Sequence, residues 1–200
     1  MIVKAKKGKS VSVKKILETG INFEHRFIKD YGELKNVIES LKNLGYKISM
    51  TQGVWDMLHI GHLRYLNEAK SKGDILVVEV DTDENTRKRK GPTRPVVPER
   101  ERLEMLAGLR CIDILMLRRS NNDPNLGLKV VRPDVLIVSS STEDVGDKKR
   151  KEMAKYCGKI IVLEPQATIS TTSRIRKLLI DGANKLAKEI QNTVEKYLKT

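Results

Sequence analysis

Apolar residues first recur at regular intervals between Tyr31 and Leu44. They are spaced three and four positions apart, and Gly45 follows the last of them (Leu34, Val37, Ile38, Leu41 and Leu44). Such spacing gathers apolar side chains on one face of a helix, and a glycine typically ends the element. The pattern predicts an amphipathic helix over residues 31–44, whereas residues 1–30 show no clean period.

Beyond this helix, short apolar runs alternate with segments of helical pattern. The runs cover residues 46–51, 74–81, 111–117, 134–140 and 159–164, and the helical segments cover residues 61–70, 98–109, 125–132, 148–157 and 170–180. Strands that are apolar nearly throughout are typical of a parallel sheet covered by helices on both faces. We therefore predict an α/β fold with a doubly wound, five-stranded parallel sheet in residues 31–180. Helical extensions are expected at both ends, over residues 1–30 and 181–200.

The composition suits a soluble globular protein, because 39% of the 200 residues are hydrophobic and 32% are charged. No apolar run approaches the roughly 20 residues of a membrane span. The basic start of the chain has no apolar core behind it, so it does not resemble a secretory signal. We expect a cytoplasmic protein with no membrane partner. Cys111 and Cys157 belong to no CxxC pair, and we expect both to be buried free thiols.

The formal charge of +13 favours a polyanionic partner. Nucleic acid, a membrane surface and phosphorylated small molecules would all satisfy it. The excess is dispersed and is not interleaved with aromatic residues, and basic runs such as residues 148–151 are usually solvated surface. Nucleic acid is therefore the less favoured partner, and the charge alone does not choose among the others.

Unusual polar sequences follow three of the predicted strands: QGVWDMLHIGH (52–62), DTDENTRKRKGPTRP (81–95) and PQATISTTSR (165–174). In doubly wound sheets, ligands bind outside the carboxyl ends of the strands. His59 and His62 flank Gly61 at the start of a helix, where unpaired N–H groups and the helix dipole stabilise a phosphate. A histidine in isolation could merely cap and pack the turn, but the HxGH spacing at a strand-to-helix turn favours a phosphate site.

Three motifs together resemble the HxGH nucleotidyltransferases of the cytidylyltransferase-like group: GVWDMLHIGH, the Lys90 and Arg94 of KGPTRP, and ISTTSRIR (169–176). Within that group, residues 80–117 are most similar to the adenylyltransferase domain of the ADP-heptose synthases, and next to the glycerol-3-phosphate cytidylyltransferases. The resemblance covers about residues 31–180. It implies a Rossmann-like nucleotidyltransferase fold.

The resemblance also implies a reaction. Such enzymes transfer a nucleoside monophosphate from a nucleoside triphosphate, here ATP ahead of CTP, to a phosphorylated sugar or polyol, and they release pyrophosphate. The second pKa of a phosphate monoester is near 6, so the attacking group needs no general base. Positioned donors and cations must instead stabilise charge on the α-phosphoryl group and on pyrophosphate. Mg²⁺ is expected to bind through the nucleotide phosphates rather than a protein site, and a homodimer is expected because relatives usually form one.

By the same resemblance, His59 and His62 bind the triphosphate, with His62 nearest the α-phosphate. Lys90 neutralises the α-phosphate and the incoming phosphate, and Lys88 is the weaker candidate for this role.

The hydroxyl run Ser170, Thr171 and Thr172 is assigned to the β- and γ-phosphates, although an ordinary helix cap is a compatible alternative.

The first loop supplies further binding residues. Gly53 and Val54 begin it, Asp56 matches the family's G-x-F-D turn, and Trp55 replaces the usual Phe. Trp55 is either core or a base-stacking platform, and core is favoured.

Two more residues match family positions. Asp83 either organises the site or caps the next segment, and Arg102 either reaches the phosphates or makes a surface ion pair.

The sequence departs from the heptose enzymes at SSST (139–142), where they carry Gly-Gly-Asp. This difference leaves the acceptor open and permits an alternative, a non-catalytic nucleotide-binding or regulatory module. An HIGH sequence also occurs in class I aminoacyl-tRNA synthetases, but the lack of a KMSKS-like loop and of room for an anticodon-binding domain argues against that class.

Overall fold

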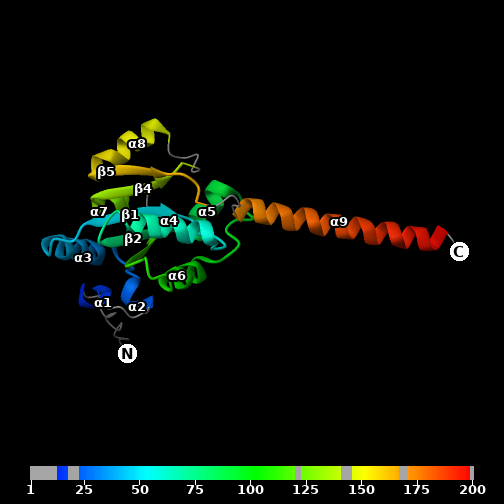
Figure 1. The fold of residues 1–200 in the computed structure, drawn as a ribbon, viewed down its shortest axis with the longest axis horizontal. Coiled ribbons are helices and arrows are strands. Elements are labelled where there is room, and N and C mark those ends of the chain that lie inside the picture. The colour runs from blue at the N-terminus through cyan, green and yellow to red at the C-terminus, as the bar shows by residue number, and fades with distance from the viewer. Residues whose placement is uncertain (1–12, 18–22, 120–122, 141–145, 167–170, 199–200) are drawn as a thin grey trace, which may run out of the picture. The chain divides into compact units, whose positions relative to one another are not determined.

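The computed structural model describes residues 13–17, 23–119, 123–140, 146–166 and 171–198. The chain divides after Gln166 into two compact units. The first contains the sheet and the second contains one long helix (Figure 1).

The sheet of the first unit has five strands, all parallel. They are β1 (Ile48–Gly53), β2 (Ile75–Asp81), β3 (Ile114–Arg118), β4 (Val135–Ser139) and β5 (Lys159–Leu163), in the order β3-β2-β1-β4-β5. The strand order reverses between β1 and β4, which is the place where doubly wound sheets bind ligands. The predicted Rossmann-like architecture is confirmed.

Helices cover both faces of this sheet (Figure 1). The helices α3 (Tyr31–Asn43) and α7 (Leu126–Val131) pack against one face, and α4 (Ile60–Lys70) and α6 (Glu99–Ala107) pack against the other. Alternate residues of a strand point to opposite faces. The two cores therefore take alternate strand residues, including Ile75 and Val77 on the α3 face and Leu76 and Val78 on the α4 face.

The first predicted helix is confirmed as α3. Oδ1 of Asp30 accepts hydrogen bonds from the amides of Gly32 at 2.8 Å and Glu33 at 3.0 Å, which caps the start of the helix. The helix ends at Asn43, and Gly45 follows with a φ of 87°. Leu44, which was placed on the apolar face, is the C-cap residue and is exposed.

The described part of the N-terminal extension contains α1 (Val13–Leu17) and α2 (Phe23–Arg26). Phe27 forms an isolated parallel bridge with Leu115, and the Arg26 guanidinium donates to the carbonyl oxygens of Ala107 and Leu109 at 3.1 and 2.7 Å. Residues 23–28 therefore pack onto the sheet-containing unit.

Three shorter elements complete the first unit: α5 (Asp83–Lys90), α8 (Asp147–Met153) and the 3₁₀ helix η1 (Ala154–Tyr156). Both cysteines are free thiols as predicted; Cys111 is buried, whereas Cys157 is only half-buried.

The second unit is α9 (Thr171–Leu198), a single helix of 28 residues. It continues without a break through residue 180, where the domain boundary was expected. No helix in the described ranges is long and apolar enough to cross a membrane.

Candidate functional site

The loop from β1 to α4 makes a sharp turn at the switch point of the sheet. Trp55 and Met57 have φ values of 58° and 48°, a left-handed conformation that is uncommon for residues other than glycine. The indole of Trp55 folds back over Gly53, where an added Cβ atom would lie 2.9 Å from Cε2. Trp55 is 6% exposed and lies in the core, as favoured from the sequence. Gly53 is thus required by the indole, a reason that the motif alone does not show.

The two histidines of the HxGH motif are stacked. Their ring centroids lie 4.0 Å apart, with an angle of 25° between the planes. His59 is the N-cap of α4, and its Nδ1 accepts a hydrogen bond of 3.1 Å from the amide of Gly61. Because Nδ1 accepts, the neutral ring carries its proton on Nε2. His59 can therefore donate a hydrogen bond from Nε2.

His62 lies between His59 and the core. Its ring meets Trp55 edge to face at 5.6 Å, and its Nδ1 is buried without a hydrogen-bond partner among the described residues. Burial, helped by the nearby charges of His59 and Lys90 and opposed by Asp56, lowers the pKa of His62 to about 4. His62 is therefore neutral at pH 7. Its unpartnered nitrogen is a position at which a ligand would gain a hydrogen bond.

Asp56 ties this turn to the loop between α5 and α6. Its carboxylate accepts hydrogen bonds from the amides of Val96 and Val97 at 3.0 Å each, and pairs with Arg94 Nη2 at 3.0 Å. Asp56 is 3% exposed, so these charged contacts are shielded from water. The aspartate of the motif therefore anchors the loop that follows Lys90.

Lys90 is the last residue of α5, and Gly91 ends the helix with a φ of 92°. Its charge contributes to the lowered pKa of His62. Partial burial, more than the neighbouring arginines, lowers the pKa of Lys90 itself. Lys88 instead forms an exposed pair with Glu84 at 2.6 Å. The structure thus favours Lys90 over Lys88 as the cation of the site.

Arg102 connects three segments around the site. It is 1% exposed. Its guanidinium donates to the carbonyl oxygens of Val97 at 2.9 Å, Val54, and Asp81 at 2.9 Å, and to Asp83 Oδ1 at 2.7 Å. The alternative of a surface ion pair is therefore wrong. Four of the five N–H groups of arginine are used within the protein, which favours a positioning role over direct phosphate contact.

The sequence left open that Asp83 caps α5, and this alternative is wrong. The N-cap is Thr82, whose hydroxyl accepts from the amide of Asn85 at 3.2 Å. The carboxylate of Asp83 binds Arg102, and its amide donates to Glu99 at 2.8 Å.

A buried acidic cluster beside the site was missed from the sequence. Asp81 ends β2 fully buried and pairs with Arg118 Nε at 2.9 Å and Arg89 Nη2 at 3.1 Å. Glu79 lies two residues earlier on the same face of the strand. It accepts hydrogen bonds from Tyr31 and Gln52. The signal was available, since Glu79 and Asp81 are charges at alternate positions in an otherwise apolar run.

Glu79 is strongly perturbed by its surroundings. Burial raises the pKa of Glu79 to about 7, against opposing effects of Arg118, Tyr31 and Gln52. A Cβ atom added at Gly127 would lie 2.0 Å from Oε1 of Glu79. The backbone of α7 therefore packs directly against the Glu79 carboxylate.

The remaining predicted residues are described only in part. Ser170 lies outside the described residues, and Thr171 and Thr172 are the first residues of α9, a unit separate from the sheet. In SSST, Ser140 donates from its amide to Leu163 and from its hydroxyl to Glu164, both at 2.9 Å. Ser141 and Thr142 lie outside the described residues.

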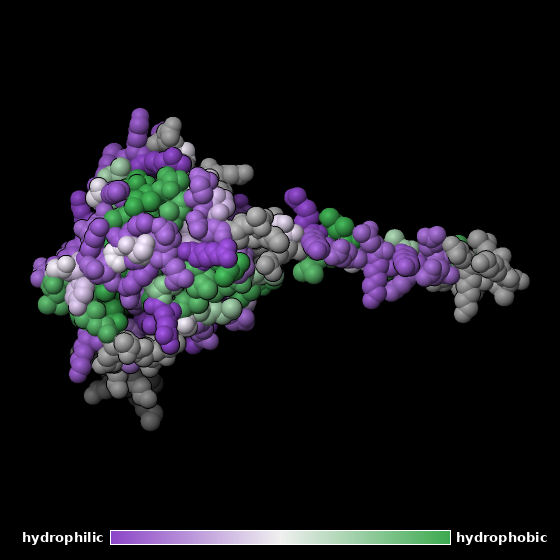
Figure 2. Space-filling model, viewed as in Figure 1, coloured by the Kyte–Doolittle hydropathy of each residue, from purple (hydrophilic) through white to green (hydrophobic). Residues whose placement is uncertain are grey.

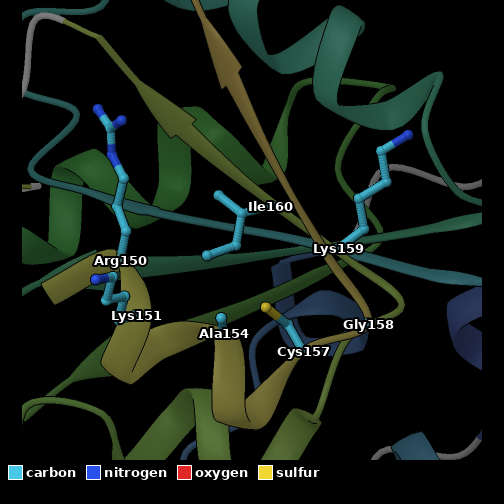
Figure 3. A pocket seen from close by; sticks show the side chains of 7 residues that line it. All are labelled: Arg150, Lys151, Ala154, Cys157, Gly158, Lys159 and Ile160. Carbon is cyan, nitrogen blue, oxygen red and sulfur yellow. The ribbon is translucent and has the colours of Figure 1, made fainter. Parts of the chain in front are cut away.

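A surface cavity lies elsewhere, between α8, η1 and the start of β5 (Figure 3). Cys157, Lys159 and Ile160 are among its lining residues. Its lining includes the first two residues of β5, at the amino end of that strand, whereas the histidines follow the carboxyl end of β1. This cavity is therefore not part of the candidate site.

A sequence model described as cytidylyltransferase-like matches residues 50–181, two thirds of the chain. The chain belongs to the cytidylyltransferase-like family. Among its curated relatives, the bifunctional protein HldE of Nitratiruptor sp. is 34% identical over 155 residues, and that of Geobacter metallireducens is 35% identical over 152 residues. These alignments cover 75% and 76% of this chain but only 32% and 31% of the relatives, so the chain spans about a third of their length.

Two solved structures are similar to this chain in fold. A lipopolysaccharide core biosynthesis protein from Thermoplasma volcanium matches with a TM-score of 0.53 and 29% identity, over 60% of this chain and 97% of the other. A pantoate-beta-alanine ligase from Francisella tularensis, at 17% identity, shares the fold, with a TM-score of 0.51 over 70% of this chain and 66% of the other.

Proposed function

We propose that this chain is a nucleotidyltransferase that transfers a nucleoside monophosphate from a nucleoside triphosphate to a phosphorylated sugar or polyol, and releases pyrophosphate. The observation that carries the proposal is the neutral His62, stacked on His59 at the start of α4 with a buried nitrogen that has no partner among the described residues. The likeness to HldE proteins favours a sugar phosphate as the acceptor and ATP, ahead of CTP, as the donor.

The chemistry requires little proton transfer. A phosphate oxygen of the acceptor forms a bond to the α-phosphorus, and the bond from the α-phosphorus to the bridging oxygen of pyrophosphate breaks. The acceptor is largely a dianion at neutral pH because its second pKa is near 6, so no base must activate it. The protein must instead orient the reactants and stabilise the charge that develops on the phosphoryl oxygens.

The described side chains supply donors for this task. His59 donates from Nε2, and the protonated Nδ1 tautomer of His62 would donate from a buried position. The first amides of α4 lie at the positive end of a helix dipole, and among them that of Gly61 already donates to His59. Lys90 adds a cation whose charge acts on His62. Donors that are fixed before the reaction stabilise developing charge without reorganising.

Asp56 and Arg102 are proposed as positioning residues. Asp56 fixes the loop after Lys90, and Arg102 joins that loop to Val54 and to the end of β2. Most of the hydrogen-bonding groups of both side chains are already used within the protein, because the Asp56 carboxylate accepts from the loop and the Arg102 guanidinium donates four hydrogen bonds. They act by holding Lys90 and the first loop in place.

Gly53, Val54, Trp55 and Asp83 are assigned to the nucleotide site through the loops they form. Ser170, Thr171 and Thr172 are proposed as ligands of the β- and γ-phosphates on the strength of the ISTT motif.

Magnesium fits this site through the substrate rather than through the protein. Within the described residues, no group of three or more His, Cys, Asp or Glu side chains is placed to hold a metal ion. Three carboxylates around the site, Asp56, Asp81 and Asp83, are each paired with arginine. We propose that Mg²⁺ binds to the triphosphate, where it would neutralise phosphate charge. A cytoplasmic location and a homodimer complete the proposal.

A second candidate is a nucleotide-binding module without turnover. It is favoured by one observation, the fixed Ser140 in place of the flexible glycines of the heptose enzymes.

Pyrophosphate release separates the two functions. Each of the four nucleoside triphosphates is incubated with magnesium and a panel of sugar and polyol phosphates, including a heptose phosphate and glycerol 3-phosphate. An enzyme releases pyrophosphate only when donor and acceptor are both present. Nucleotide binding by calorimetry without release for any pair would support the non-catalytic module and reject the proposed reaction.

A further inference from the structure

The long helix α9 carries an apolar stripe that its own unit does not cover. Leu179, Leu186, Ile190 and Val194 of this stripe are each between 50% and 69% exposed. In Figure 2 the visible face of α9 is mostly hydrophilic, with hydrophobic side chains emerging at its edge. The family model matches residues 50–181, so most of the stripe lies beyond the end of that match.

The spacing of the stripe is symmetric. Its residues are Ile175, Leu179, Ala183, Leu186, Ile190 and Val194, in steps of four, four, three, four and four. The pattern therefore reads the same in both directions. Residues 11 positions apart repeat it, and this period is close to that of a straight helix, so the stripe runs nearly parallel to the helix axis.

Reversing the helix about the point between Asn184 and Lys185 superposes the stripe on itself. Val194 falls on Ile175, Ile190 on Leu179, and Leu186 on Ala183. In an antiparallel pair, each large central side chain therefore meets a small one. Side by side in a parallel pair, the two Ala183 side chains would face each other and leave a gap, which costs stability.

We propose that the α9 helices of two copies of this chain pair antiparallel through this stripe, about a two-fold axis near residues 184 and 185. A two-fold interface uses the same patch on both subunits and must be self-complementary, as this stripe is. A membrane surface would not require the symmetry, and residues 171–200 contain neither Trp nor Phe, which amphipathic membrane helices often use. The inference is independent of the proposed reaction.

The size of the contact sets the expected affinity. The stripe from Ile175 to Val194 is about 29 Å long at 1.5 Å per residue. Two helices in contact over this length bury an area at the low end of the range for specific interfaces. We expect a dimer with a dissociation constant in the micromolar range, visible by sedimentation between about 1 and 100 µM.

The first test replaces a central residue of the stripe. Leu186→Lys places a charge in both central layers and should weaken the dimer at least tenfold. Asn184→Lys puts the same side chain on the opposite face of the same turn and should leave dimerisation unchanged. Circular dichroism must show equal helix content in the two variants. If the unaltered chain is monomeric throughout the range, or if both variants dimerise like it, the proposal is wrong.

The second test determines direction. In a Cys157→Ser background, chains carrying Leu179→Cys are mixed with chains carrying Ile190→Cys and are mildly oxidised. Antiparallel pairing predicts that the mixed disulfide forms faster than either homogeneous one, because Leu179 faces Ile190 of the other copy. Faster linkage of Leu179→Cys chains to each other would indicate parallel pairing. Binding of a monomeric chain to phosphatidylglycerol vesicles, abolished by Leu186→Lys, would assign the stripe to a membrane instead.

Discussion

His62→Ala is expected to lower kcat about 100- to 1000-fold while changing the dissociation constant of the nucleotide by less than about threefold. The substitution removes a neutral donor from a buried position, where its hydrogen bond strengthens as charge develops on the α-phosphoryl group. Removing one such preorganised donor costs about 2.7–4 kcal/mol of transition-state stabilisation. In the ground state the bound triphosphate keeps the amides of α4, His59 and Lys90, so binding should change little.

The matched control is His62→Asn. Its amide can donate from nearly the same place as Nδ1, so this variant should retain a substantially larger kcat than His62→Ala. His62 also packs against Trp55 and His59, and the thermal stability of both variants should be compared to exclude a general loss of structure.

Steady-state kinetics and nucleotide calorimetry provide the assay. Because the pKa of His62 lies near 4 in the free protein, this group should add no ascending limb to the pH profile of kcat/KM between about pH 5.5 and 8. An equal loss of nucleotide affinity and of rate would refute the proposed role, since it would show that His62 contributes uniformly to both states.

Three further predictions concern the residues around the histidines. Lys90→Ala should depress kcat at least 100-fold, whereas Lys88→Ala, which removes only an exposed pair, should leave it within about twofold; the reverse order would move the cationic role to Lys88. Arg102→Met should destabilise the protein by about 3–5 kcal/mol in urea unfolding, because it leaves three carbonyl groups and the partly buried carboxylate of Asp83 without their donor; a loss below about 1 kcal/mol would contradict the described contacts. Glu79 binds a proton more tightly in the folded protein than in the unfolded chain. It therefore contributes to the free energy of unfolding below about pH 4.5, and this contribution, on the order of 3 kcal/mol, is lost as the pH rises to about 7. Glu79→Gln should remove most of that decline between pH 5 and pH 8, and an unchanged decline would assign it to other groups.

The fold could be predicted because local pattern determines it. Apolar strands such as residues 75–81 bury both faces, and the three- and four-residue spacing of residues 31–44 fixes which side of α3 is covered. The alternation of strands and helices predicted a doubly wound parallel sheet, whereas the strand order and its switch between β1 and β4 are known only from the structure. The predicted features depend mainly on neighbours in sequence.

The supporting contacts of the site could not be predicted in the same way. Asp56 binds Val97, 41 residues away, and Arg102 binds Val54, 48 residues away. Such bonds depend on how loops meet in space, which periodicity does not encode. For the same reason Arg102 was placed near phosphate or on the surface, although the structure buries it. The motif located the two histidines, but it did not show that His62 would be neutral.

The most direct test of the account is ¹⁵N NMR of the histidine rings, titrated with and without a non-hydrolysable nucleoside triphosphate and magnesium. The chain contains three histidines, so His62→Asn assigns the signal. In the free protein the His62 ring should stay neutral down to about pH 4. Nucleotide should shift its nitrogen resonances and raise its pKa, because the nearby phosphate favours the protonated ring. A ring that titrates near 6.5 and does not respond to the nucleotide would contradict the central claim, which is that His62 is uncharged in the free protein and binds a phosphate of the nucleotide.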